Sequence, residues 1–379
     1  MGLTLLSSVT IDHPGAGTRT LQLCQGDLSN MLPADYVDIL VVSALPGDYS
    51  PTPGSLIGAL SANGVSVQQL SGNKAFNYEP VLPTWASQPI TNPSPGIEFG
   101  RIVVYEPANP ATTSAQLIST IFQSVQAFQG STAATVALPL VSTGSGGADP
   151  SLILRELFFS AAHGAATAFP LNLIKLVIYN QSQVAPLLAL FNTYVYNYTN
   201  LPTLSGLPGN YSGYAGQCWS WAQANAGNFP NMTARQLFGV QMYTSNYYGT
   251  INGALRANSL VDPTYMAIEP LIEAIDSGLS NIVASPGLTY RGINSLWNPF
   301  TPGTTVLELA YTSTSRPASG FYYSAPYKIN LTGQTGKPIA NISQYPSENE
   351  ILYHRLMNEL VTANANNLIE CTEVVVTLP

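Results

Sequence analysis

The chain has 379 residues, enough for two domains with hydrophobic cores of their own. Only 8% of its residues are charged, yet 45% are hydrophobic and 21 are tyrosines, which excludes a disordered chain and predicts a surface solvated mainly by amides and hydroxyls. The 12 Lys and Arg against 20 Asp and Glu leave a formal charge of −8 without a basic run, so no nucleic-acid groove is expected.

Four short apolar runs rich in β-branched residues predict buried strands in the first half of the chain, at residues 38–43, 101–105, 135–141 and 173–179. Apolar residues at helical spacing predict a helix over 113–128. A second helix is predicted over 150–168, capped by Asp149 or Ser151. This alternation indicates a three-layer α/β domain with a mostly parallel sheet, which we place at residues 1–195.

The second half has a different order of elements. A run of glycines and prolines predicts a linker, which we place at residues 196–229. Helices are predicted next, over 233–243, 248–257 and 265–278. Short strands with turns between them follow, at 288–292, 306–311, 327–331, 350–353 and 372–378. Helices first and strands afterwards predict an α+β domain at residues 230–379.

Cysteine and histidine usage argues against a metal centre. Cys24, Cys218 and Cys371 are far apart and odd in number, and the three histidines are scattered. The apolar stretches are interrupted by charges or shorter than the ~20 residues that a spanning helix needs. The N-terminus lacks the basic start and apolar core of a signal peptide. We therefore expect no metal, no membrane span and no signal peptide.

Three segments of the second half place charged or hydroxyl side chains at predicted strand ends. The first holds Arg291 and Gly292, and the second is the hydroxyl triplet Ser313-Thr314-Ser315. The third is a Glu-x-Glu pair that enters a strand, preceded by a tyrosine, at residues 345–350. Because charges are scarce in this chain, an arginine and two glutamates at strand ends are unusual.

In order, spacing and flanks, these segments resemble the ADP-ribosyltransferases of the Arg–Ser–Glu class, which include bacterial toxins. The resemblance covers roughly residues 230–378 and includes an upstream helix pattern that runs from Tyr243 to Arg256. It implies the fold of that class and NAD as the substrate that donates ADP-ribose.

The resemblance assigns roles to the individual residues. Cleavage of the nicotinamide–ribose bond develops positive charge on the ribose, and Glu350 would stabilise that charge and hold the ribose hydroxyl. Ser313 would orient Glu350 through a hydrogen bond. Arg291, with its neighbour Gly292, would hold the NAD phosphates. Thr314 and Ser315 would line the nicotinamide site, and Phe321 (or Tyr322) would stack on the nicotinamide.

The acceptor is indicated by Glu348 and Tyr345. On an extended backbone, residues i and i+2 project to the same face, so Glu348 is expected beside Glu350. Members of the class carry a glutamate here when they modify arginine, since a carboxylate accepts hydrogen bonds from a guanidinium and makes it a better nucleophile. By the same resemblance, Tyr345 would contact the protein substrate.

Each motif also has an ordinary structural explanation. Arg291 could pair with a carboxylate in the fold interior, and the hydroxyl triplet could be a simple turn. Glu348 and Glu350 could lie on a solvated strand face. The joint occurrence of all three segments favours the functional interpretation.

The first half resembles the macrodomains, which bind ADP-ribose, over about residues 1–195. The resemblance rests on the segments 21–28 and 137–147, the second of which is rich in glycine. It implies that Asp27 would meet the adenine amine, and that Gly144, Gly146 and Gly147 would wrap the diphosphate with their backbone N–H groups. Residues 43–53 depart from the pattern of the hydrolytic members, whose catalytic Asn is missing here. We therefore expect a binding or docking module, with a ligand-free supporting domain as the alternative.

The segment around Cys218, Gly-Gln-Cys-Trp-Ser-Trp, resembles the nucleophile segment of papain-like proteases. A thiolate nucleophile would need a histidine partner, and His354 is the only histidine downstream. A buried cysteine beside two aromatic residues is the simpler interpretation.

The sequence thus predicts a mono-ADP-ribosyltransferase that uses NAD and modifies an arginine on a protein. The resemblance further suggests a toxin or effector, secreted or injected, that acts in a target cell's cytosol. Two rivals remain: an NAD glycohydrolase, in which water is the acceptor, and a non-enzymatic ADP-ribose-binding protein.

Overall fold

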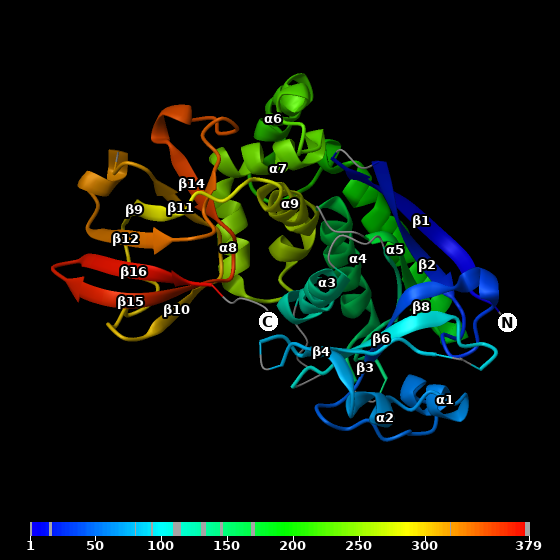
Figure 1. The fold of residues 1–379 in the computed structure, drawn as a ribbon. Coiled ribbons are helices and arrows are strands. Elements are labelled where there is room, and N and C mark those ends of the chain that lie inside the picture. The colour runs from blue at the N-terminus through cyan, green and yellow to red at the C-terminus, as the bar shows by residue number, and fades with distance from the viewer. Residues whose placement is uncertain are drawn as a thin grey trace. The chain divides into compact units, whose positions relative to one another are not determined.

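The computed structural model describes the chain except residues 1, 15–16, 80, 92–93, 109–114, 130–133, 145–146, 168–170, 319 and 376–379. It divides into two compact units, Met1–Thr199 and Asn200–Thr377 (Figure 1). In the described part of the chain, no helix has the length and apolar character needed to cross a membrane.

The first unit is built on an eight-stranded sheet. Its central strands are parallel and its edges antiparallel. The strand order is β1 (Thr4–His13), β2 (Gly17–Gln25), β8 (Leu171–Ile178), β7 (Ala134–Pro139), β3 (Val37–Ser43), β6 (Phe99–Tyr105), β5 (Thr84–Ser87) and β4 (Lys74–Asn77). The four strands predicted in this half are confirmed as β3, β6, β7 and β8.

Each face of this sheet carries its own core, because successive strand residues point to opposite sides. In β3, Ile39 and Val41 belong to one buried cluster, while Leu40 and Val42 belong to the other. The first cluster contains residues of α4 (Pro150–Ala166) and α5 (Val184–Thr199) and of α3 (Ala115–Gln129). The second contains residues of α1 (Leu56–Ala62) and α2 (Val67–Ser71). Asp149 caps α4, as one of the two expected candidates.

The second unit begins with four helices: α6 (Tyr211–Asn225), α7 (Ala234–Thr244), α8 (Tyr248–Ala257) and α9 (Pro263–Ser280). The linker predicted at residues 196–229 is therefore wrong, since the 15 residues of α6 lie within it. Residues Tyr211, Ala215, Cys218 and Ala222 recur at helical spacing and are buried. The glycines of α6 are tolerated because this apolar stripe packs on α7, where Trp219 meets Phe238 edge-on with ring centroids 5.9 Å apart.

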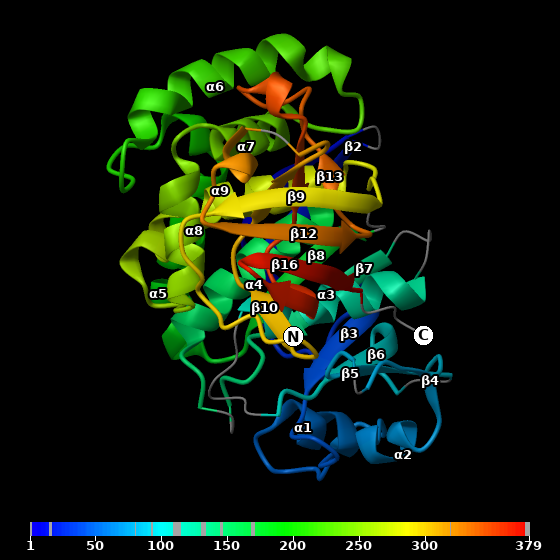
Figure 2. The same cartoon turned by 90° about the vertical axis from the view of Figure 1, so that its left-hand side faces the viewer.

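The helices are followed by a second eight-stranded sheet (Figure 2). This order confirms the predicted α+β pattern. The strands run β10 (Thr305–Glu308), β15 (Met357–Ala365), β16 (Leu368–Val374), β12 (Tyr327–Gly333), β9 (Gly287–Ile293), β11 (Thr312–Ser315), β14 (Glu350–Tyr353) and β13 (Lys337–Pro338). The three segments that carry the expected catalytic residues are thus neighbours, although 59 positions separate Arg291 from Glu350 in sequence (350 − 291 = 59).

Candidate active site

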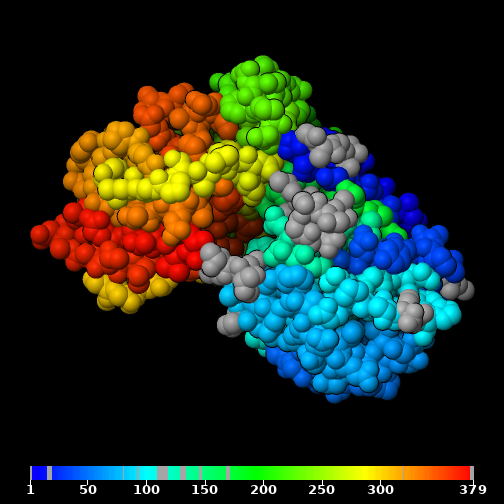
Figure 3. All heavy atoms as spheres, viewed as in Figure 1, coloured from blue at the N-terminus to red at the C-terminus, as the bar shows by residue number. Residues whose placement is uncertain are grey.

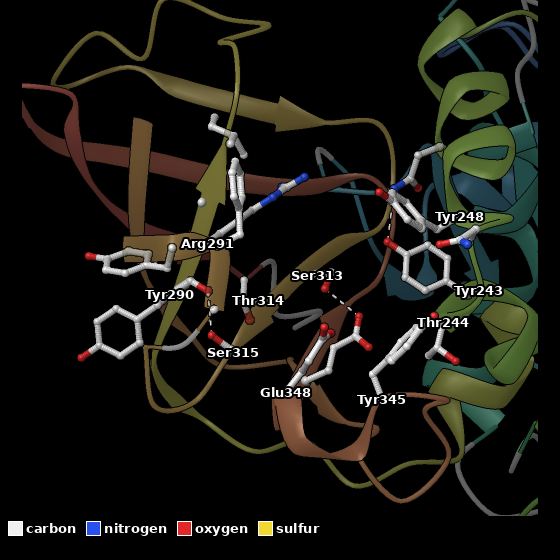
Figure 4. Close-up of a pocket in the computed structure, with 18 of the residues that line it drawn as sticks. Tyr243, Thr244, Tyr248, Tyr290, Arg291, Ser313, Thr314, Ser315, Tyr345 and Glu348 are labelled. Carbon is white, nitrogen blue, oxygen red and sulfur yellow. Dashed lines mark hydrogen bonds between the residues drawn. The ribbon is translucent and has the colours of Figure 1, made fainter. Parts of the chain in front are cut away.

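The second unit contains a cavity of about 520 Å³. Its wall is formed by residues of α7, α8, β9 and β11, by the turn Gly320–Tyr323, and by the segment that leads into β14 (Figure 4). All the residues that the sequence assigned to this site line the cavity: Arg291, Gly292, Ser313, Thr314, Ser315, Phe321, Tyr345, Glu348 and Glu350.

Strand register explains why these side chains meet. Ser315 lies opposite Glu350, and Ser313 lies opposite Leu352, in the antiparallel pair β11–β14. Residues directly opposite each other share a face of the sheet, so Ser313, Ser315 and Glu350 point the same way. Leu352 packs among the helices of the second unit, which makes this the helical face.

Glu350 is buried, with 6% of its surface exposed. The Ser313 hydroxyl donates a hydrogen bond of 2.6 Å to its Oε1 (Figure 4). Burial is the main reason why the pKa of Glu350 is raised to about 7, and the charge of Glu348 raises it further. Hydrogen bonds from Ser313 and Ser343 favour the ionised form and lower the pKa.

Glu348 reaches the cavity by a different route from the one expected. It ends a short 3₁₀ turn, Pro346–Glu348, and Asn349 has a left-handed backbone with φ of 47°. The extended i, i+2 geometry predicted for Glu348 and Glu350 is therefore wrong, because Pro346 favours a turn there and only Glu350 lies on the strand. The turn nevertheless leaves Glu348 exposed at the cavity, with Tyr345, 47% exposed, beside it.

Arg291 extends from β9 toward the helical side of the cavity (Figure 4). Its Nη1 donates to Thr312 Oγ1 at 3.3 Å and lies 3.5 Å from Glu308 Oε2. Its guanidinium carbon is 5.1 Å from the ring centroid of Trp297. The structure therefore places Arg291 both in the cavity and beside a carboxylate.

The hydroxyl triplet serves the sheet as well as the cavity. The Thr314 hydroxyl is buried and donates to the Ile351 carbonyl at 2.9 Å, while the Ser315 hydroxyl donates to the Tyr290 carbonyl at 3.5 Å. Of the three hydroxyls, that of Ser313 is the one bonded to the buried glutamate.

Gly292 lets the turn that carries Phe321 approach β9. A Cβ at this position would lie 2.7 Å from Ala325 Cβ and 2.9 Å from Tyr322 Cα, which is closer than side chains tolerate. Tyr322 packs edge-on against Tyr290 and donates to Asn330 Oδ1 at 2.7 Å. Phe321 is thereby presented at the cavity with 49% of its surface exposed.

Several further residues of α7, of α8 and of the segment between them line the cavity, although no role was predicted for them: Tyr243, Thr244, Ser245, Asn246, Tyr248 and Asn252. Asn252 donates to the Tyr243 hydroxyl at 3.2 Å, and Tyr243 donates to the Tyr311 carbonyl at 3.4 Å. The sequence signal that could have identified Tyr243, Tyr248 and Asn252 was the helix pattern before Arg256. Tyr248 and Asn252 are four positions apart, so they share a face of α8.

The residues expected to bind ADP-ribose in the first unit lie at one edge of its sheet. Asp27 follows β2 and Gly144 follows β7, both strands parallel to β8 between them, so their carboxyl ends share an edge. Asp27 Oδ1 accepts from the Ser29 amide at 2.8 Å. Gly147 has φ of 69°, a conformation that favours glycine, and Gly146 lies outside the described residues.

Cys218 lacks the environment of a nucleophile. It is fully buried in the middle of α6, and burial raises the pKa of its thiol to about 11. Its Sγ accepts from Gln344 Nε2 at 3.3 Å, whereas His354 Nδ1 lies 3.8 Å from Asp276 Oδ1. The similarity to papain-like proteases is therefore confined to the local sequence.

Residues 219–370 match the family model of the ADP-ribosyltransferase exoenzyme. The resemblance stated for the C-terminal half is confirmed at that level. Among the described residues, no group of three side chains suited to a metal ion occurs.

Two curated relatives match part of the chain. Mav of Mycobacterium avium (strain 104), named as an NAD(+)–arginine ADP-ribosyltransferase, is 29% identical over 117 residues, 29% of this chain. Tre1 of Serratia proteamaculans (strain 568), an NAD(+)–protein-arginine ADP-ribosyltransferase, is 29% identical over 126 residues, 32% of this chain. The chain spans only 14% and 27% of the lengths of these relatives.

Solved structures with a local likeness include the type III effector XopAI of Xanthomonas axonopodis pv. citri and the C3 exoenzyme of Clostridium limosum. The match to XopAI has a TM-score of 0.41 at 19% sequence identity, and it covers 51% of this chain and 94% of the XopAI chain. The C3 exoenzyme has a TM-score of 0.34 at 19% identity and covers 42% and 94%.

Proposed function

We propose that the chain is an NAD-dependent mono-ADP-ribosyltransferase of the Arg–Ser–Glu class that modifies arginine on a protein target. The observation that carries the proposal is the buried Glu350, held by the Ser313 hydroxyl in a cavity that also presents Glu348 and Arg291. The family model matched by residues 219–370 and the arginine-specific names of both curated relatives support it.

The first chemical step is the departure of nicotinamide. The bond between the ribose carbon and the pyridine nitrogen breaks, its electron pair leaves with nicotinamide, and the ribose becomes an oxocarbenium-like cation. Glu350, as the carboxylate, holds the ribose hydroxyl and stabilises this cation, and Ser313 keeps the carboxylate in place. Arg291 holds the diphosphate, and Phe321 stacks on the nicotinamide.

The second step is attack by the target arginine. A guanidinium nitrogen forms a bond to the ribose carbon and loses one proton. Glu348 accepts hydrogen bonds from the incoming guanidinium, which raises its nucleophilicity, and takes that proton. Tyr345 beside Glu348 contacts the target protein. On the same resemblance, we propose an effector that is secreted or injected and acts in the cytosol of a target cell.

Incubation of the protein with labelled NAD and a mixed cell lysate tests the proposal. We expect labelled proteins, with ADP-ribose mapped to arginine by mass spectrometry, and loss of labelling with Glu350→Ala. Free labelled ADP-ribose without labelled protein would identify a glycohydrolase. Undiminished labelling by Glu350→Ala would overturn the assignment of the site.

We propose ADP-ribose binding as a second function, for the first unit. Asp27, Gly144 and Gly147 lie at the carboxyl edge of parallel strands, and Tyr179, which follows β8 between them, is 73% exposed. An exposed aromatic ring and glycine backbone N–H groups at the same sheet edge suit an adenine ring and a diphosphate. A ligand-free supporting domain is the alternative.

A further inference from the structure

We propose that Glu308 is a positioning residue for NAD, which acts by holding the guanidinium of Arg291, a residue of the cavity wall, close to that of Arg256. The inference rests on the proposed function, because it concerns the diphosphate end of the same site. Neither Glu308 nor Arg256 is among the residues that line the cavity, so both would act through Arg291.

The contacts of Glu308 bridge two elements. It ends β10, and its side chain is 1% exposed. Its Oε2 lies 3.5 Å from Arg291 Nη1 on β9, and its Oε1 lies 3.5 Å from Arg256 Nη2 on α8. One buried carboxylate therefore faces two arginines that are 35 positions apart in sequence (291 − 256 = 35).

Trp297 joins the same cluster. Its ring centroid is 5.1 Å from the guanidinium carbon of Arg291 and 5.4 Å from that of Arg256. A cation near an aromatic ring is stabilised by the ring's quadrupole, so the indole helps to keep both arginines close despite their like charge. With Glu308, it defines where the Arg291 guanidinium lies.

The cluster keeps an excess of positive charge. Glu308 divides its two oxygens between the two arginines, so it offsets one of two positive charges. Glu359 on the adjacent strand β15 is also close enough to interact with Arg291, but burial raises its pKa to about 7, so much of it is neutral at pH 7. A diphosphate, which carries two negative charges, suits such a site.

The fixed geometry of Arg291 leaves part of its guanidinium for a ligand. Both of its hydrogen bonds, to Glu308 and Thr312, leave from Nη1. A guanidinium has five donors in a rigid plane, so anchoring one nitrogen also sets the direction of the others. Arg291 lines the cavity, where those donors are available to phosphate oxygens.

Glu308→Gln tests the role with little change in shape. The amide has one acceptor oxygen and one donor NH₂ group, so it cannot accept from both arginines at once. In the full chain, we expect the apparent KM for NAD and the inhibition constant of ADP-ribose, measured against NAD cleavage, to rise about tenfold. The inhibition constant of nicotinamide, which lacks the diphosphate, should stay within about twofold of wild type.

The matched control is Glu373→Gln. Glu373 is another buried carboxylate of this sheet, but it accepts from the backbone amides of Gln334 and Thr335. This variant should lower the thermal midpoint without changing the ratio of the two inhibition constants. If Glu308→Gln does not fold, Glu308→Asp, which keeps both acceptor oxygens on a shorter stem, is measured in its place.

The outcomes separate this inference from the proposed function. No NAD cleavage by the wild-type chain would remove the proposed function itself. If the wild-type chain cleaves NAD, two results would overturn the role of Glu308 alone. One is that Glu308→Gln has the KM and inhibition constants of wild type. The other is that it raises the inhibition constants of ADP-ribose and nicotinamide by the same factor.

Discussion

At the scale of single residues, Glu350 combines two opposing influences. Its burial favours the neutral carboxyl, whereas its proposed role requires the carboxylate, and the hydrogen bond from Ser313 favours that ionised form. Bound NAD would add a positive charge on its pyridine ring and shift the balance further toward the anion. The fraction of Glu350 that is ionised in the free protein should therefore determine the activity near neutral pH.

This balance predicts the pH dependence of the reaction. Because the pKa of Glu350 is raised to about 7, the active carboxylate is lost as the pH falls through that value. We expect kcat/KM for NAD cleavage to rise from about pH 6 to about pH 8 and then level off. Ser313→Ala removes a hydrogen bond that lowers the pKa, so its midpoint should move to higher pH. A midpoint that moves to lower pH, or a flat profile, would contradict this assignment.

Substitutions of Glu348 and Glu350 should have different effects when nicotinamide release and transfer to arginine are measured independently. Glu348→Gln keeps the shape of the side chain but removes the charge that we propose activates the target guanidinium. We expect transfer to arginine to fall about 100-fold or more, while nicotinamide release with water as acceptor stays within a few fold. Equal loss of both activities would place Glu348 in bond cleavage instead.

At the scale of elements, the close approach of the turn Gly320–Tyr323 to β9 determines where Phe321 lies. Gly292 makes that approach possible, because a Cβ would overlap both the Ala325 side chain and the Tyr322 backbone. The tyrosine pair Tyr290–Tyr322 and the Tyr322–Asn330 hydrogen bond hold the turn from the other side. The end of the cavity that we propose for the nicotinamide therefore depends on a backbone contact.

Gly292→Ala should displace this turn. We expect the free energy of unfolding to fall by about 1–3 kcal/mol, as for other overpacked sites, and KM for NAD to rise. Gly253→Ala is the control, since Gly253 lies within α8 and a Cβ there would meet open space. That variant should be neutral or more stable by up to about 1 kcal/mol. Denaturant titration checks both, and equal stability of the two variants would refute the packing argument.

The elements also show what the sequence could and could not predict. The buried strands were predictable because β-branched runs such as 38–43 pack on both faces. The stripe of Tyr211, Ala215, Cys218 and Ala222 was missed because glycines masked its helical period. Glu348 was placed on an extended strand because only tertiary contacts settle whether the chain turns at Pro346. Glu308 contacts arginines of two other segments, and no local sequence pattern predicts that these segments lie next to each other.

At the scale of the whole molecule, the chain comprises two units with separate cores. Residues of the first unit form two buried clusters around its sheet, and residues of the second form two others. Figure 3 shows the surface of both units. Since the proposed NAD site consists entirely of second-unit residues, NAD should stabilise that unit by mass action.

Calorimetry on the full chain can separate the two proposed ligand sites. Glu350→Ala should bind NAD without turning it over. For this variant we expect two unfolding transitions, and NAD should raise the midpoint temperature of one of them. A ligand at 100 times its Kd stabilises by about 2.7 kcal/mol. If the first unit binds ADP-ribose, that ligand should also raise the midpoint temperature of the other transition, which belongs to the first unit. ADP-ribose that leaves this transition unchanged would contradict the proposal for the first unit.

The most direct measurement of the central claim is the rate of nicotinamide release from NAD by wild type and by Glu350→Gln, at about pH 8 and with thermal unfolding of both chains recorded. Glu350→Gln is nearly identical in shape but cannot carry the negative charge that stabilises a ribose cation. We expect its rate to fall about 10²–10³-fold while the protein remains folded. A folded Glu350→Gln variant that releases nicotinamide at the wild-type rate would contradict the account.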